Sequence, residues 1–309
     1  MAEGSMKRKR VLLLCVLMIY SCAAYKPVVI IHGVWDLRFS LNFLADMIRQ
    51  EHPGTEVHVI DMLHGWKSLA PLWYQVKAFY AKITPIMQKL SLLLAIEEGQ
   101  GGLVTKGAAG ACFVVQHGYS QGGILSRGII ESMDHNITRF ISLSSPQAGQ
   151  YGDEFLRLIF PQYIKETAYE LFYSKMGQSV SVANYWNDPH HQELYYKYSN
   201  YLPYLNNEVD DAYKKDYRTN FLKLERLVLI GGPDDGVITP WQSSHFAYFD
   251  ENENITEMRD QYYYRTDTFG LRTLDKAGKV TIYEIPGVVH TLWHHNVTVI
   301  QKCILPWLD

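Results

Sequence analysis

The chain has 309 residues, of which 47% are hydrophobic and 20% charged, and its 29 basic and 32 acidic residues give a formal net charge of -3. This balance excludes disordered, collagen-like and fibrous proteins, and without a basic excess nucleic acid is a poor candidate partner. A chain of this length forms one large α/β domain or two small domains, and it can bury a sizeable core either way.

The first 24 residues have the pattern of a secretory signal peptide. The basic cluster Lys7–Arg10 precedes the apolar run Val11–Tyr20 and then small residues up to Ala24. Since a membrane-spanning helix needs ~20 apolar residues, we expect cleavage and no stable membrane insertion, with an uncleaved anchor as the alternative. Cleavage would leave residues 25–309 and make the net charge -6, because four basic residues and Glu3 are removed.

Cysteine and sequon positions fit the secretory route. Loss of Cys15 and Cys22 leaves Cys112 and Cys303, which are too few for a disulfide-based scaffold, although one bridge between them stays open. Acceptor sequons that predict a glycoprotein occur at Asn136, Asn254 and Asn296.

Strand and helix patterns alternate along the rest of the chain. Runs rich in Val and Ile predict six strands, at residues 28–33, 56–63, 112–117, 140–145, 226–232 and 279–285. Helical spacing of apolar residues predicts helices at 41–48, where Ser40 can be the cap, at 69–83, which Pro85 should kink or end, and at 123–133. Such alternation predicts an α/β fold with a mostly parallel sheet and helices on both faces.

Two stretches depart from this alternation. Leu90–Ala111 changes from leucine-rich to rich in glycine and alanine, which predicts a flexible insertion. Tyr151–Tyr217 holds 12 of the 22 tyrosines and has no strand pattern, and this predicts a helical cap over about residues 146–224. The tyrosines either pack as core on the sheet or form a roof over an apolar ligand, and the sequence leaves both open.

The sequence Gly118-Tyr-Ser120-Gln-Gly122 stands between a predicted strand and a predicted helix. This is the setting of a nucleophile elbow, in which a serine lies on a strained turn and close chain approach leaves no room for a Cβ on the flanking glycines. A serine alcohol is a weak nucleophile and needs a base that is oriented by an acid. In such folds the acid and then the histidine follow later strands.

Candidates for both partners occur in this order. Asp234 and Asp235 follow the strand at 226–232, and His290 follows the strand at 279–285. Local sequence does not separate the two aspartates. His290 and His294 have helical metal-ligand spacing, but without a third ligand nearby in sequence we expect no metal site. No cofactor is expected either.

Acyl transfer also needs amide donors for an oxyanion. The elbow supplies the backbone N–H of Gln121. The loop His32–Asp36 after the first strand is placed to supply a second N–H from Val34, unless His32-Gly33 is an ordinary turn that ends the strand.

Several longer stretches make the chain resemble the palmitoyl-protein thioesterase family, and within it the lysosomal branch. They are YKPVVIIHGVWD, PGTEVHVIDM, GYSQGG, FISLSSPQAGQYGD, NYWNDPHH, LVLIGGPDDGVITPWQSS, Asp267-Thr-Phe-Gly270 and GVVHTLWH, and together they span nearly all of residues 25–309. LVLIGGPDDGVITPWQSS is far more specific than the elbow motif.

The resemblance implies an α/β-hydrolase fold and a soluble lysosomal glycoprotein that hydrolyses fatty acyl thioesters, such as palmitoyl-CoA or S-acyl cysteine. It implies Ser120 as nucleophile, His290 as base and Asp235, not Asp234, as the acid. An oxygen-ester lipase or carboxylesterase is the alternative enzyme, because fold does not fix substrate. A non-catalytic hydrolase-like binding protein is the third reading.

The chain also departs from the family pattern. The link at Leu90–Ala111 is longer than in the family, and the family's cysteine pairs are absent. Residues of other types stand at those places, namely Gly118, Ser126, Phe172 and Ala183. The missing cysteines bear on the disulfide content, and the longer link bears on the placement of the elbow.

Overall fold

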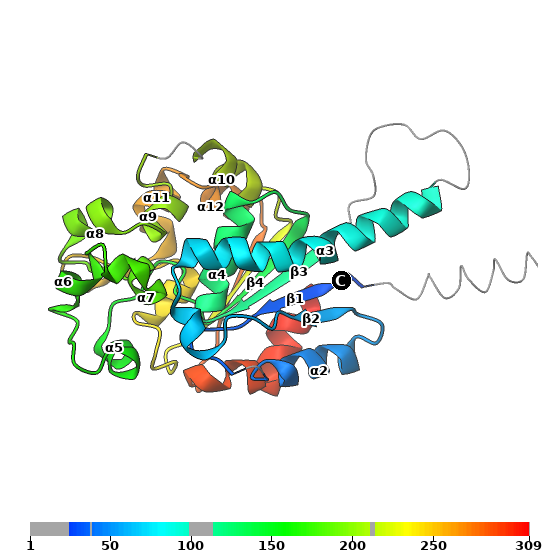
Figure 1. The fold of residues 1–309 in the computed structure, drawn as a ribbon, viewed down its shortest axis with the longest axis horizontal. Helices are drawn as coiled ribbons and strands as arrows, with labels where there is room; N and C mark the ends of the chain where they lie inside the picture. Colours follow the sequence, from blue (N-terminus) through cyan, green and yellow to red (C-terminus); the bar gives the residue numbers. More distant parts are fainter. Residues whose placement is uncertain (1–24, 38, 99–113, 211–213, 309) are drawn as a thin grey trace, which may run out of the picture.

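The computed structural model describes residues 25–37, 39–98, 114–210 and 214–308 (Figure 1). The predicted signal peptide, Cys112 and the second part of the predicted insertion lie outside these ranges. Within them, no helix combines the length and the apolar character needed to cross a membrane. Cys303 is buried.

A six-stranded sheet forms the centre of the molecule. Its strands lie in the order β2-β1-β3-β4-β5-β8, and every neighbouring pair is parallel. The bounds are β1 Val28–Ile31, β2 Val57–Val59, β3 Val114–Tyr119, β4 Ile137–Leu143, β5 Arg226–Gly231 and β8 Val280–Glu284. Because the strands are parallel, their carboxyl ends meet at one edge, where residues distant in sequence come together.

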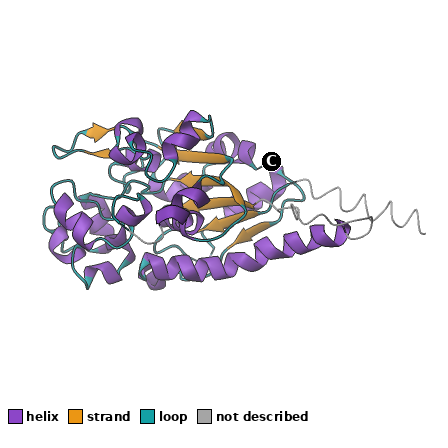
Figure 2. Cartoon of the chain, turned by 90° about the horizontal axis from the view of Figure 1, so that it is seen from above, coloured by secondary structure: helices purple, strands orange, loops and turns teal. Residues whose placement is uncertain are grey.

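Each face of the sheet is covered by helices (Figure 2). Side chains alternate between faces along a strand, so Val29 and Ile31 join one hydrophobic core and Val28 and Ile30 join the other. The first core includes side chains of α3 (Leu72–Glu98) and α4 (Gln121–Ser132). The second includes side chains of α2 (Asn42–Glu51) and of the C-terminal segment that holds α13 (Val297–Val299), the π-helix η6 (Ile300–Ile304) and the 3₁₀ helix η7 (Leu305–Trp307). Covering both faces explains why β1 is a continuous apolar run.

The segment between β4 and β5 folds into short helices. They are α5 (Asp153–Ile159), α6 (Ala168–Phe172), η2 (Gly177–Ser179), α7 (Ser181–Asn184), α8 (Gln192–Tyr198), α9 (Leu202–Leu205) and α10 (Lys214–Phe221). Figure 1 shows α5–α9 gathered beyond one end of the sheet. Of the eleven tyrosines of this segment that the structure describes, six are buried, namely Tyr151, Tyr173, Tyr185, Tyr195, Tyr201 and Tyr217. Core packing therefore accounts for these six, and the other described tyrosines are partly buried or exposed.

Smaller elements complete the chain. The 3₁₀ helix η1 (Gly65–Leu69) precedes α3. Between β5 and β8 lie η3 (Trp241–His245), the antiparallel pair β6 (Tyr248–Phe249) and β7 (Ile255–Thr256), η4 (Met258–Asp260), α11 (Tyr262–Arg265) and α12 (Leu271–Lys276). The 3₁₀ helix η5 (His290–His295) follows β8.

The structure corrects several local predictions. Helix α3 passes through Pro85 and extends to Glu98, so the first part of the predicted flexible insertion is helical, as the high helix propensity of its leucines allows. Ser40 does not cap α2, because it precedes the N-cap Leu41 and its hydroxyl donates to the carbonyl of Leu37. His290, His294 and His295 all lie in the 3₁₀ helix η5, so His290 and His294 do not have the α-helical spacing that the sequence suggested.

Candidate active site

Ser120 lies at the sharp turn between β3 and α4, as the motif predicted. Its φ of 53° is in the left-handed region, which is costly for a residue with a Cβ. A Cβ on Gly118 would lie 2.5 Å from the carbonyl oxygen of Gly122, and one on Gly122 would lie 2.4 Å from the carbonyl oxygens of Ile31 and His32. The two glycines thus let β1, β3 and α4 approach closely enough to form the turn.

Gly122→Ala should destabilise the protein by about 3 kcal/mol, since the new methyl group would meet backbone atoms that cannot rotate away. Alanine is otherwise the better residue inside a helix, so helix propensity does not account for such a loss. Thermal unfolding measures the effect. Gly278→Ala is the control: Gly278 has a φ of 68° and open space around it, and its replacement should cost about 1 kcal/mol. Equal losses in the two variants would contradict the close-approach argument.

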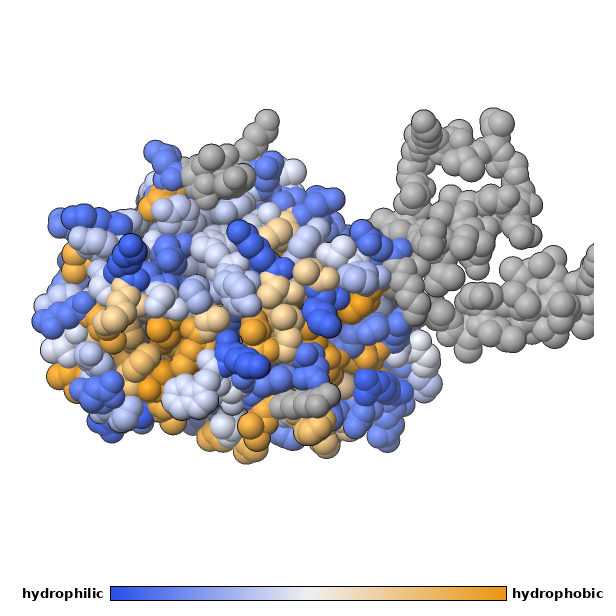
Figure 3. All heavy atoms as spheres, in the orientation of Figure 1, coloured by the Kyte–Doolittle hydropathy of each residue, from blue (hydrophilic) through white to orange (hydrophobic). Residues whose placement is uncertain are grey.

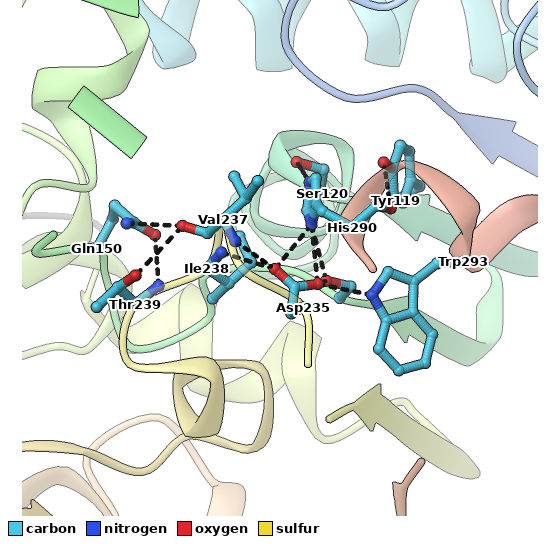
Figure 4. Close-up of polar contacts among 10 residues, drawn as sticks. Tyr119, Ser120, Gln150, Asp235, Val237, Ile238, Thr239, His290 and Trp293 are labelled. Atoms are coloured by element: carbon cyan, nitrogen blue, oxygen red, sulfur yellow. Dashed lines mark hydrogen bonds and ion pairs between the residues drawn. The ribbon is translucent and has the colours of Figure 1, made fainter. Parts of the chain in front are cut away.

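Three predicted side chains meet at the carboxyl edge of the sheet (Figure 4). Ser120 Oγ lies 2.9 Å from His290 Nε2, and His290 Nδ1 lies 2.9 Å from Asp235 Oδ2 and 3.0 Å from Oδ1. Ser120 comes from the β3–α4 turn, Asp235 from the loop after β5, and His290 from the start of η5 after β8. They are 7%, 3% and 8% exposed, so their mutual contacts are largely shielded from water. This geometry is that of a Ser-His-Asp triad.

Asp234, the other candidate acid, lies elsewhere. Its side chain is exposed and accepts a hydrogen bond from the N–H of Gly287. The local sequence left the two aspartates equivalent and the family resemblance implied Asp235, and the structure places Asp235 against the histidine.

The carboxylate of Asp235 is held by several donors besides His290. The N–H groups of Val237 and Ile238 donate to Oδ1, and Trp293 Nε1 donates to Oδ2 over 2.6 Å. Burial alone would raise the pKa of Asp235, but hydrogen bonds from His290, from Ser144 and from the Ile238 N–H outweigh it and hold the pKa below its usual value. The acid is therefore kept ionised beside the imidazole.

Backbone contacts fix His290 in place. Its N–H donates to the carbonyl of Asp235 over 2.8 Å, and its own carbonyl accepts from the hydroxyl of Tyr119 over 2.8 Å. The ring of Tyr119 also lies against the imidazole, with centroids 5.3 Å apart. Tyr119, Trp293 and Ser144 were not among the predicted site residues, although Tyr119 directly precedes Ser120 and Trp293 lies three residues after His290 in η5.

Of the two predicted oxyanion donors, Gln121 directly follows Ser120, and Val34 lies in a loop that passes close to it, since a Cβ on Gly33 would lie 2.9 Å from the Cβ of Ser120. Gln121 is the first residue of α4, so its N–H has no partner within the helix. Around Val34, the N–H of Gly33 donates to Asp36 Oδ2 and the N–H of Trp35 donates to Ser68 Oγ. These two bonds fix the loop, and among the described residues no acceptor is found for the intervening Val34 N–H.

The side chain of Gln121 connects the 3₁₀ helix η1 to the helices between β4 and β5. Its Nε2 donates to the carbonyl of Ser68, and its Oε1 accepts from the hydroxyls of Ser181 and Tyr185. Gln121 thereby connects α7 and the residue after it, Tyr185, to the turn that carries Ser120. Gln121 was predicted to act through its backbone N–H, and its side chain has a structural role as well.

Metal binding at the histidines is not favoured. Across the described parts of the chain, no group of three or more His, Cys, Asp or Glu side chains is arranged to hold a metal ion. His294 packs against the ring of Tyr119, and burial lowers its pKa to about 4. His294 therefore belongs to the packing behind His290.

Apolar side chains cover part of the surface near the cap. Figure 3 shows hydrophobic residues gathered over the face on which α5–α7 lie, and the exposed apolar side chains of this segment include Leu158, Ile164 and Met176. A separate cavity of about 680 Å³ lies between α8 and α11, and the triad is not part of its lining.

The parallel sheet, the strained serine turn and the Ser-His-Asp geometry are those of a hydrolase with the α/β-hydrolase fold. A family model described as palmitoyl protein thioesterase matches residues 27–290. The chain is 45% identical to the lysosomal thioesterase PPT2 of Bos taurus, covering 93% of this chain and 88% of that protein. Identity to the Homo sapiens protein of the same name is 44%, with 93% and 89% covered, and to the Drosophila melanogaster homolog 45%, with 93% of each covered. The chain belongs to the palmitoyl protein thioesterase family, which confirms the resemblance seen in the sequence.

Proposed function

We propose that the chain is a thioesterase that hydrolyses fatty acyl thioesters through Ser120, His290 and Asp235. The observation that carries the proposal is the continuous chain of contacts from Ser120 Oγ through His290 to Asp235 in a member of this family. The substrate class follows from relatives named as thioesterases. An acyl thioester such as palmitoyl-CoA is the expected partner, and the negative net charge disfavours nucleic acid.

In the first half of the reaction, Ser120 Oγ attacks the carbonyl carbon of the thioester and its proton moves to His290 Nε2. The charge that develops on the carbonyl oxygen is stabilised by the N–H groups of Val34 and Gln121. When the carbon–sulfur bond breaks, His290 returns the proton to the departing thiolate. The acyl group then remains as an ester on Ser120.

Water completes the reaction on the same residues. His290 accepts a proton from a water molecule whose oxygen attacks the acyl carbonyl, and the ester bond to Ser120 breaks as the proton passes to Oγ. Asp235 orients His290 and stabilises its charged form in both halves. The products are a free fatty acid and a thiol, and no metal or cofactor takes part in this scheme.

A comparison of two substrates tests the thioester assignment. Hydrolysis of palmitoyl-CoA should exceed that of an oxygen ester with the same acyl chain, because an oxygen-ester lipase is the second candidate that this triad supports. A strong preference for the oxygen ester would overturn the thioesterase proposal. Labelling by a fluorophosphonate probe distinguishes the thioesterase and the lipase from a non-catalytic binding protein, since a protein that is not labelled would have no activated serine.

We propose the lysosome as the site of action and the three sequons as glycosylation sites. The Bos taurus and Homo sapiens relatives are named as lysosomal thioesterases. Asn254 is exposed in the turn between β6 and β7 and is the most accessible acceptor. Asn136 lies partly buried just before β4, and the side chain of Asn296 accepts a hydrogen bond from the N–H of Val299 at the start of α13.

A further inference from the structure

Ser144 lies immediately after β4, which is the strand next to the elbow strand β3. Its side chain is fully buried, and its φ of 44° places a second serine of this sheet edge in the left-handed region. The N–H of Ser144 donates to the carbonyl of Ile230, while the carbonyl of the preceding Leu143 accepts from the N–H of Ser120. The backbone at this point is therefore held between the elbow and β5.

The hydroxyl of Ser144 contacts both partners of the nucleophile. Ser144 Oγ donates to Asp235 Oδ2 over 2.5 Å and lies 3.1 Å from His290 Nδ1. The other donors to Asp235 come from its own loop and from η5, whereas Ser144 reaches it from β4. A hydrogen bond to a carboxylate is among the stronger ones and limits rotation of the group.

We propose that Ser144 is a positioning residue for the triad, which fixes the Asp235 carboxylate and through it the orientation of His290. This inference rests on the triad of the proposed function. With the carboxylate fixed, Nδ1 of His290 carries the proton toward Asp235, and Nε2 is presented to Ser120 Oγ. A glycine at this position would avoid the cost of the left-handed backbone but would lack the hydroxyl.

Two substitutions separate positioning from folding. Ser144→Ala and Ser144→Gly should each lower kcat for palmitoyl-CoA by about 10- to 100-fold, with KM changed less than twofold, as expected for loss of a hydrogen bond to a charged group. Ser144→Gly should keep or raise the melting temperature because it relieves the strained backbone. Ser145→Ala is the matched control: Ser145 is equally buried, and its hydroxyl contacts Gln147 and not the triad. Wild-type kcat in Ser144→Gly would overturn the proposal.

The pH profile gives a readout that a purely structural role would not move. The hydrogen bond from Ser144 is one of the contacts that lower the pKa of Asp235, so removing the hydroxyl should raise that pKa. The acid limb of kcat/KM should then move to higher pH. The other titratable groups against His290 are His294 in η5 and Tyr119 in β3, and both remain in the variants. An unmoved acid limb would contradict the proposal.

The rate of fluorophosphonate labelling distinguishes failure of this inference from failure of the proposed function, because labelling needs an activated Ser120 and no thioester. Ser144→Gly should be labelled at least tenfold more slowly than the wild type. A wild type that is labelled but does not hydrolyse palmitoyl-CoA would overturn only the thioesterase assignment. Equal labelling rates would overturn only the role of Ser144, and a wild type that is not labelled would overturn both.

Discussion

Replacing Ser120 with alanine should lower kcat for palmitoyl-CoA by about 10⁴- to 10⁶-fold, because no other group would form the covalent bond to the acyl carbon. The oxyanion donors and the bound substrate geometry would remain, so a small residual rate over the uncatalysed reaction is expected. The turn should keep its shape, since alanine retains the Cβ that Ser120 already carries at a φ of 53°. Single-turnover and steady-state assays of purified protein measure the loss.

The control for this variant is Ser132→Ala. Ser132 ends the same helix, α4, and its hydroxyl donates to the carbonyl of Gly128, away from the triad. Its activity should stay within about twofold of the wild type. A Ser120→Ala protein that remains folded and retains more than a hundredth of wild-type activity would show that Ser120 is not the nucleophile.

Asp235→Asn should reduce kcat by about 10³- to 10⁴-fold, and Asp234→Asn should leave it within about twofold of the wild type. The amide keeps the shape of the side chain but removes the charge that stabilises protonated His290, and it allows the wrong histidine tautomer. Asp234 is exposed and contacts only the N–H of Gly287 among the hydrogen bonds of the described chain. The two variants differ by one position and carry the same chemical change.

The activity of both variants should also be measured at pH values from about 4 to 8. Asp235→Asn should lose activity throughout, because the lowered pKa of Asp235 keeps the wild-type carboxylate ionised even in acid. Activity lost in Asp234→Asn and retained in Asp235→Asn would reverse the assignment of the acid.

Sequence patterns predicted all six strands of the central sheet, although β2 spans only Val57–Val59 where residues 56–63 were expected. The prediction for residues 226–232 matches β5 at Arg226–Gly231. The two strands beside the elbow were shifted: β3 continues through Gly118 to Tyr119, and β4 already begins at Ile137. The glycine in the first case and the polar residues Thr138 and Arg139 in the second interrupt the apolar pattern without interrupting strand pairing.

Other features of the fold and the site could not be predicted from the sequence, for physical reasons. The pair β6–β7 has two residues in each strand, which is too short for any periodicity to be detected. Pro85 is accommodated within α3, where sequence rules favour a break. Ser144 and Trp293 bind Asp235 only because the fold brings residues 91 and 58 positions apart into contact, and no local motif encodes such a meeting.

The separation of the triad along the chain has a consequence for how the protein acquires activity. Ser120 and His290 are 170 residues apart, and the segment α5–α10 must be looped out before β5 can pair with β4. Contacts between such distant positions form late and slowly, since closing long loops costs entropy before any contact compensates for it. During refolding, recovery of serine reactivity should therefore lag behind recovery of helical structure. Catalytic activity should therefore appear only when the whole chain has folded.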